Sequence, residues 1–217
     1  MANPDPVDDH RTVLTERLRA TRERTLGLFA PLPHEHLVGQ PSAFLSPPLW
    51  DLGHIAAKRE LWLARRLAGR PSLHPALEDV YDAFGTPRGV RGDAPILGED
   101  EAHAYLSAVR ETSLDVLGGC DLDADDPLTV AGFVFDMVAQ HEAQHTETVL
   151  QAFQLLPAGS YAPPARRALP PGDAVTGWVE VPGGPFEMGP PPADSSTDCE
   201  RPRHVRETAP VLMAATR

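Results

Sequence analysis

The sequence predicts a mainly α protein in which a four-helix bundle is followed by a short, incomplete segment that contains β-strands. Four long stretches place apolar residues at helical spacing, and each is bounded by proline or glycine. No strand-like alternation occurs before about residue 160, and the composition changes after Leu156. Helices of about 20 residues or more without intervening strands are typical of a bundle.

Capping residues define the four helices. Ser46 precedes two prolines and is expected to cap the second helix, since proline is favoured in a first helical turn. Gly118 and Gly119 close the third helix. Asp126-Pro127 is expected to start the fourth, and Pro157 ends it. The predicted helices span about residues 8–29, 46–69, 98–117 and 126–156.

The predicted domain organisation has three parts. The bundle occupies residues 1–157, and a linker rich in proline, glycine and alanine occupies 158–176. Residues 177–217 open with a strand pattern at Trp178–Val181, turn at 182–184 and start a second strand near Phe186. Because about 40 residues rarely form a core of their own, this segment is expected to be the incomplete start of a second domain.

Charge and cysteine content exclude several classes of function. The formal net charge is -12, from 19 basic and 31 acidic residues, which disfavours nucleic acid and anionic membranes as partners. The two cysteines, Cys120 and Cys199, form no CxxC pair, and a reducing compartment is expected. No signal-peptide pattern or membrane-length apolar run is visible, so we expect a cytoplasmic protein.

The fourth predicted helix carries two histidines in an apolar stripe. His141 and His145 stand one turn apart, between Val138 and Val149 on the face expected to point into the bundle. Two buried imidazoles one turn apart can share a metal ion, and a facing helix can supply a third ligand. His54, next to Gly53 in the second helix, is the best candidate.

The metal and its chemistry stay open at this point. Three neutral imidazoles suit zinc that holds a water molecule, or iron(II) that binds substrate and oxygen. Residues 141–145 also spell H-E-x-x-H, the pattern of zinc peptidases. A peptidase is disfavoured because no strand precedes the linker and Glu142 lies off the interior stripe, where we expect it to be solvated or to support the ligands.

Several segments together resemble the sulfoxide synthases of ergothioneine biosynthesis, which are iron(II)-dependent enzymes. These segments are LSPPLWDLGHIAAKRELWLARRLAG, DVYDAFGTPRGVR, FDMVAQHEAQHTETVLQAFQLL and GWVEVPGGPFEMG followed by ERPRHV. The resemblance implies a DinB-like four-helix bundle and then the start of a formylglycine-generating-enzyme-like domain. It covers about residues 45–205, in the order found in the family.

The resemblance implies a reaction and its residues. His54, His141 and His145 would bind iron(II), with zinc as the alternative metal. The substrates would be oxygen, trimethylhistidine and a thiol, either gamma-glutamylcysteine or cysteine, joined through a C–S bond with sulfoxidation. Arg88 and Arg91 would bind the carboxylates of the thiol. No catalytic acid or base is identified in this chain.

The chain departs from the family pattern at its C-terminal end. Family members continue well beyond the PGGPFEMG strand, whereas RETAPVLMAATR is not expected to continue the strand pattern. We therefore expect a truncated form that binds iron(II) without completing the reaction by itself. The alternative is a stand-alone DinB-like metal protein, either a thiol transferase or a binding module.

Overall fold

The computed structural model describes residues 6–162, 176–191 and 198–215. The chain divides into two compact units, Met1–Ala162 and Pro163–Arg217. All α-helices of the described residues lie in the first unit, and all strands lie in the second. The mainly α fold is thereby confirmed. None of the described helices is long and apolar enough to cross a membrane.

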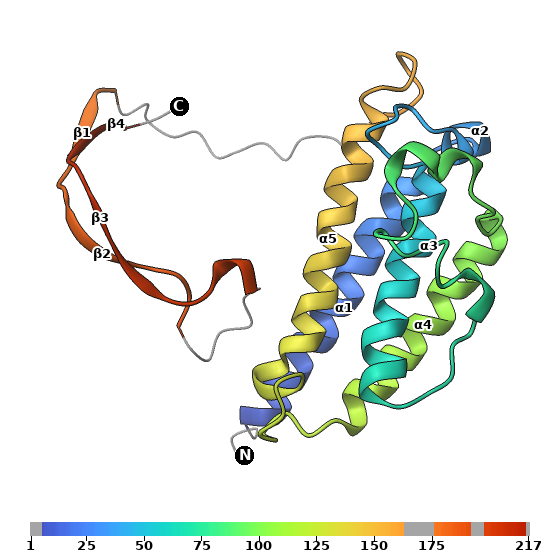
Figure 1. Ribbon diagram of the computed structural model, residues 1–217, viewed down its shortest axis with the longest axis horizontal. Coiled ribbons are helices and arrows are strands. Elements are labelled where there is room, and N and C mark those ends of the chain that lie inside the picture. The colour runs from blue at the N-terminus through green and yellow to red at the C-terminus, as the bar shows by residue number, and fades with distance from the viewer. Residues whose placement is uncertain (1–5, 163–175, 192–197, 216–217) are drawn as a thin grey trace, which may run out of the picture. The chain divides into compact units, whose positions relative to one another are not determined.

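The first unit is a bundle of four long helices (Figure 1). Helix α1 packs against α5, and α3 packs against both α4 and α5. A short helix, α2, spans His34–Val38 between α1 and α3. The long helices are α1 (Pro6–Phe29), α3 (Pro48–Arg59), α4 (Glu99–Gly119) and α5 (Phe133–Phe153).

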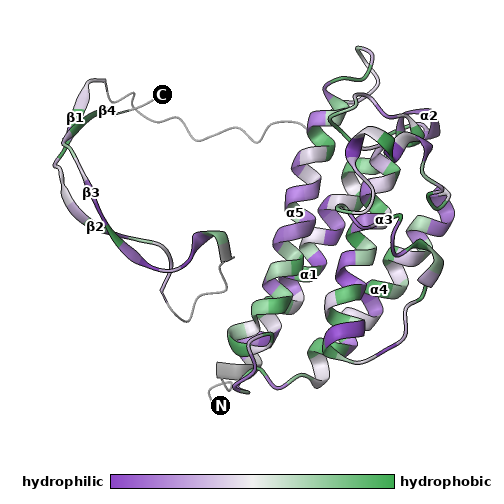
Figure 2. Ribbon diagram, in the orientation of Figure 1, coloured by the Kyte–Doolittle hydropathy of each residue, from purple (hydrophilic) through white to green (hydrophobic). Residues whose placement is uncertain are grey.

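Two clusters of buried side chains hold the bundle together. Each long helix carries both hydrophobic and hydrophilic residues (Figure 2). A hydrophobic stripe at helical spacing lets one face of each helix pack inward. On α5, Val149 belongs to the cluster around Trp50 and Tyr105, and Ala139 belongs to the cluster around Leu14. Residues 141–146, most of which are polar, therefore lie between two packed segments of α5, which fix their position.

The fourth helix begins later than predicted. Helix α5 starts at Phe133 rather than at Asp126, and a 3₁₀ turn, η4 (Val130–Gly132), precedes it. Ala131 and Gly132 have φ values of 51° and 69°, in the left-handed region that an α-helix excludes. A Cβ on Gly132 would lie 2.6 Å from Leu14 Cδ1, so glycine also permits the close approach of α1.

The second helix differs from its prediction at its start and in the geometry of its last two turns, but it ends beside Gly69 as expected. Pro47, not Ser46, is the N-cap, because the Ser46 hydroxyl instead accepts a hydrogen bond of 2.8 Å from Arg91 Nη1. After Arg59 the helix continues as a π-helix, η1 (Glu60–Leu67). The Glu60 carboxylate is buried there and accepts hydrogen bonds from Tyr105 Oη and, at 2.6 Å, from the Leu73 amide.

The connection between η1 and α4 is anchored on α3. It contains two 3₁₀ turns, η2 (Pro75–Leu77) and η3 (Arg88–Asp93). Trp50 Nε1 donates a hydrogen bond of 2.9 Å to the Val80 carbonyl oxygen. Tyr81 packs so closely on α3 that a Cβ on Gly53 would lie 2.2 Å from its Cζ. This loop therefore reaches the helix that carries His54.

The second unit is an antiparallel ribbon whose pairing differs from the prediction. The strands are β1 (Trp178–Val181), β2 (Gly184–Met188), β3 (His204–Thr208) and β4 (Val211–Ala214), and a 3₁₀ turn, η5, spans Asp198–Glu200. Strand β1 pairs with β4, and β2 pairs with β3, so residues 182–184 do not form a hairpin turn.

The last strands form where none was expected. Residues after 205 continue in β3 and β4, and Gly183 passes so close to Pro210 that a Cβ there would lie 2.7 Å from its nitrogen. The break between β3 and β4 at Pro210 therefore faces the break between β1 and β2, and the strands pair on both sides of it. Most of the predicted linker, 163–175, lies outside the described residues.

Candidate metal centre

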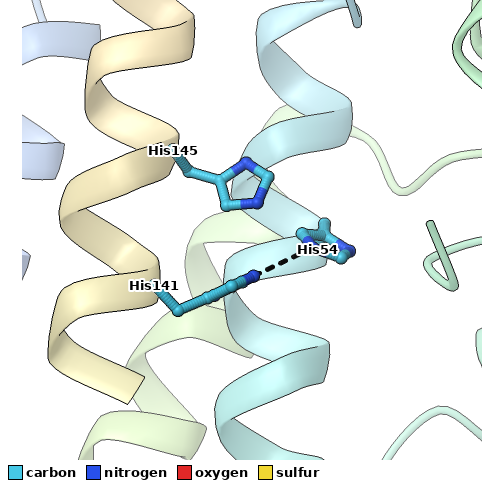
Figure 3. Close-up of side chains that lie close together, drawn as sticks. All are labelled: His54, His141 and His145. Carbon is cyan, nitrogen blue, oxygen red and sulfur yellow. Dashed lines mark hydrogen bonds between the residues drawn. The ribbon is translucent and has the colours of Figure 1, made fainter. Parts of the chain in front are cut away.

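Three imidazoles converge between α3 and α5. His54 comes from α3, and His141 and His145 come from successive turns of α5 (Figure 3). One nitrogen from each ring lies within 4.8 Å of the nitrogens from the other two. His54 Nε2 and His141 Nε2 are 3.2 Å apart. The two histidines of the apolar stripe and the candidate on the facing helix are thus brought together.

Backbone and side-chain acceptors orient two of the three rings. His54 Nδ1 lies 2.7 Å from the Tyr81 carbonyl oxygen, which can only accept, so Nδ1 carries the proton and Nε2 faces the other histidines. His145 Nδ1 lies 2.9 Å from Asp51 Oδ1. Trp50 stacks on His54 with ring centroids 4.7 Å apart and planes 15° apart, which restricts rotation of that ring.

Burial keeps two of the imidazoles neutral. Burial, with the nearby His145 and His141 as smaller causes, lowers the pKa of His54 to about 2. Burial likewise lowers the pKa of His141 to about 3, with His145 as the next cause. Near pH 7 both rings therefore have a lone pair available, which is the form that binds a metal ion.

The donor set fits a divalent transition metal. Imidazole nitrogens bind zinc or iron at about 2.0–2.2 Å, so two ligands of one ion stand roughly 3 Å apart. The 3.2 Å between the Nε2 atoms of His54 and His141 matches that spacing. Three protein ligands leave coordination positions for other molecules, as in catalytic sites.

A cavity of about 550 Å³ opens beside the three histidines. Its charged lining residues are Lys58, Arg88 and Arg91, and none of its described lining residues is an aspartate or glutamate. In a chain with a net charge of -12, this cavity is locally positive. It therefore suits a ligand that carries carboxylates.

The two predicted substrate arginines have different surroundings. Arg88 is exposed, and Arg91 is buried with 4% of its surface exposed. Arg91 Nε donates to the Thr86 carbonyl oxygen at 2.9 Å, and the guanidinium lies 3.6 Å from the centre of the Trp50 ring. Arg91 is thus held by the loop and by α3, whereas Arg88 faces the cavity from an exposed position.

Glu142 is buried, so the first of the two roles expected for it, a solvated one, is wrong. Its side chain is 1% exposed and Oε1 accepts hydrogen bonds from Arg22 Nε at 2.7 Å and from Thr25 Oγ1 at 2.8 Å. Arg59 Nη2 lies 3.1 Å from Oε2. Because two guanidinium groups bind this carboxylate, it is not available as the general base that a zinc peptidase requires.

Asp51 and Tyr81 are the site residues that sequence reasoning missed. Asp51 is 1% exposed in the first turn of α3. Its signal was a single acidic residue inside the apolar stretch LWDLGHI, three positions before His54. Burial raises the pKa of Asp51, and its bond to His145 opposes that shift. Tyr81 contributes through its backbone, so its residue type carried no signal.

Comparison with known families agrees with this architecture. The family model of the DinB superfamily matches residues 17–149, which include α3, the anchored loop, α4 and the histidines of α5. The chain belongs to the DinB superfamily. Its match ends within α5, so the strand unit lies outside the part that this family model describes.

Three curated relatives of this DinB superfamily chain share one name, "Hercynine oxygenase". The protein of Mycolicibacterium smegmatis is 41% identical over 210 residues, covering 90% of this chain and 45% of the relative. That of Mycolicibacterium thermoresistibile is 41% identical over 208 residues, covering 90% and 44%. That of Mycobacterium tuberculosis is 41% identical over 211 residues, covering 94% and 46%. The chain spans less than half the length of these relatives.

Proposed function

We propose that the bundle binds iron(II) through His54, His141 and His145 as the metal-binding part of an oxygenase that acts on hercynine, which is trimethylated histidine. The observation that carries this proposal is the convergence of three imidazoles in a chain 41% identical to proteins named hercynine oxygenase. Zinc is the alternative metal, because the same ligands suit it.

The proposed reaction is a step of ergothioneine biosynthesis. It joins the sulfur of gamma-glutamylcysteine or cysteine to a ring carbon of hercynine. The thiol gives up its S–H hydrogen and the ring its C–H hydrogen as the C–S bond forms. One atom of O₂ ends on sulfur as the sulfoxide, and the other leaves as water with the two hydrogens. Iron(II), when bound, supplies the redox chemistry that lets dioxygen react with a thiol.

The positive cavity supports a thiol substrate with carboxylates. Both candidate thiols carry carboxylates, and Lys58, Arg88 and Arg91 place three cations around the space beside the histidines. We assign to Arg88 the direct contact with a substrate carboxylate, because it is exposed and can present two donors. Arg91 adds its charge while it keeps the loop fixed on Trp50.

The cavity also has an apolar part that positions a bound substrate. Trp62, Phe84 and Met137 line it together with the cations. Apolar walls around a few polar groups are typical of small-molecule sites, and a volume of about 550 Å³ falls in their usual range. Such walls reduce the access of water and strengthen the attraction between the arginines and a carboxylate.

Turnover of the iron-loaded chain tests the proposal. The full chain, purified without oxygen and loaded with iron(II), is mixed with oxygen, hercynine and each thiol, and the coupled sulfoxide is measured by mass spectrometry. We expect iron(II)-dependent oxidation of one preferred thiol, with a weakened dependence on that thiol in Arg88→Ala, and no coupled sulfoxide at rates typical of enzymes, about 1 s⁻¹ or more. Coupled sulfoxide at such rates would overturn the expectation that this chain binds iron(II) without completing the reaction. Transfer of the thiol to another acceptor, or thiol binding without oxygen consumption, would instead support the thiol transferase or binding module.

A further inference from the structure

We propose that Asp51 is a positioning residue of the metal centre, a role that depends on the metal site proposed above. Its carboxylate holds His145 with the proton on Nδ1, so that the lone pair of Nε2 points to the metal. Its negative charge also offsets the charge of the ion in a cavity lined by cations. No residue of the histidine triad performs either task.

The contact between Asp51 and His145 is direct and enclosed. Asp51 Oδ1 lies 2.9 Å from His145 Nδ1, and the Asp51 side chain is 1% exposed. An ionised carboxylate accepts hydrogen bonds and cannot donate them, so the imidazole must supply the proton from Nδ1. Histidines that bind metals commonly donate their other ring proton to a carboxylate, which fixes the ring and makes it a stronger ligand.

The histidines are oriented by two different kinds of acceptor. His54 donates to the Tyr81 backbone carbonyl, whereas His145 donates to a side chain that brings a full negative charge. A charged acceptor forms a stronger hydrogen bond than a neutral one. Substitution can remove the Asp51 acceptor and leave the backbone intact, so this contribution can be measured separately.

The charge balance of the site also favours a nearby carboxylate. Three imidazole ligands bring no negative charge, and the cavity beside them is lined by three cationic side chains. Two buried carboxylates adjoin the described cluster, Asp51 and Glu142. Two arginines bind Glu142, whereas Asp51 Oδ2 has no hydrogen-bond partner among the described residues. Asp51, whose charge also interacts with Arg91 and Arg88, is therefore the carboxylate that can contribute to balancing a divalent ion.

This arrangement separates a positioning role from a structural one. A buried carboxylate oxygen without a partner costs folding free energy. Asparagine has the same shape, and its carbonyl can still accept a hydrogen bond from His145, but it removes the charge. We therefore expect Asp51→Asn to lose metal affinity while the metal-free protein keeps its thermal stability. A purely structural role predicts the opposite pattern.

In the experiment, the unsubstituted 217-residue chain (the parent) and the Asp51→Asn variant are titrated with iron(II) and with cobalt(II) in the absence of oxygen. We expect about 10–100-fold weaker binding in the variant, the usual effect of losing such a partner, and an altered cobalt(II) visible spectrum. Glu99→Gln is the matched control, because Glu99 Oε2 makes the same 2.9 Å contact with Nδ1 of His34, outside the cluster. The control should bind both ions like the parent.

Nitrogen-15 NMR of the metal-free parent provides a test that does not depend on the variant. We expect His145 protonated on Nδ1, and a population with Nε2 protonated to rise in Asp51→Asn. If the parent binds neither ion, the proposed metal site fails and this inference with it. If the parent binds but Asp51→Asn binds equally well, or if the parent His145 is protonated on Nε2, only the role of Asp51 is overturned.

Discussion

His141 and Glu142 are neighbours on α5, yet they belong to two different kinds of polar cluster. Glu142 is enclosed by Arg22, Arg59 and Thr25, and both of its oxygens have partners. His141 turns its Nε2 toward His54 at the edge of a cavity. The first cluster is closed by protein groups, whereas the second leaves ring nitrogens directed at a shared point.

The difference shows how one short pattern can serve two purposes. In zinc peptidases the glutamate of H-E-x-x-H shares the site with the histidines. Here Glu142 instead contacts Arg22 of α1 and Arg59 at the end of α3. The closed cluster joins α1, α3 and α5 by charge, and the open one is suited to bind an ion. Substitutions in the open cluster should therefore weaken metal binding, whereas substitutions in the closed cluster should lower the free energy of unfolding.

The largest expected effect is on metal binding in the open cluster. His145→Ala or His141→Ala should abolish stoichiometric binding of iron(II), because two remaining imidazoles hold a divalent ion weakly. Metal content after anaerobic loading and desalting measures this. His34→Ala, which changes an exposed histidine outside the cluster, should bind metal normally. Full loading of His145→Ala would remove that residue from the set of ligands.

The next effect is on folding, in the closed cluster. Glu142→Gln removes one partner of a buried ion pair and leaves two buried guanidinium groups without compensation, so we expect a loss of about 3–5 kcal/mol in the free energy of unfolding. Denaturant unfolding of the metal-free protein measures it. Glu147→Gln, at an exposed position of the same helix, should change stability by less than about 0.5 kcal/mol.

A different outcome for Glu142→Gln would reverse the comparison. If the variant kept its stability but changed how the protein binds metal or activates water, Glu142 would belong to the open cluster. The contacts with Arg22 and Arg59 argue against that outcome.

Sequence periodicity could predict one cluster and not the other. The histidines were found because their helical spacing places them on the same stripe as Val138 and Val149. Glu142 lies one position off that stripe, so the pattern predicts that it is solvated or that it supports the ligands. Its partner Arg22 lies 120 positions away, on a second helix that packs against α5, and no local pattern reports such a contact.

The boundaries of the elements show the same limit. The sequence pattern predicts too early a start for α5, because nothing in the composition indicates that the backbone of Ala131 is in the left-handed region. Ser46 was expected to cap a helix, but a buried arginine from a loop 45 positions away uses its hydroxyl. Local signals identify helices and their faces, whereas contacts between distant segments decide how polar side chains are used.

A smaller effect is expected where the loop meets the open cluster. Gly53→Ala places a Cβ 2.2 Å from Tyr81 Cζ, so Tyr81 must move and the carbonyl that orients His54 moves with it. We expect a loss of about 1–3 kcal/mol in stability, as for other overpacked sites, together with weaker metal binding. Gly118→Ala in α4, where nothing lies within 4 Å, should be neutral or stabilising by up to about 1 kcal/mol. Parent-like metal binding by Gly53→Ala would show that the loop and the histidines are independent.

The smallest effect is the pH dependence of the metal-free bundle. Burial lowers the pKa of His54 to about 2 and that of His141 to about 3, from about 6.5 in the unfolded chain. The unfolded state therefore binds more protons as the pH falls below about 6.5, and the stability that is fully present above this value decreases until the folded-state pKa is reached. Each histidine should contribute a loss of about 1 kcal/mol between pH 7 and pH 5.5.

Chemical denaturation across this pH range, in parent and His141→Ala, measures that contribution. The variant lacks one buried imidazole, so its stability should fall less steeply with acidification than that of the parent. His34→Ala should keep the parent slope, because His34 is exposed. Equal slopes in the parent and His141→Ala would mean that protons reach the open cluster without unfolding the bundle. The histidines would then be as accessible to protons as they are proposed to be to a metal ion.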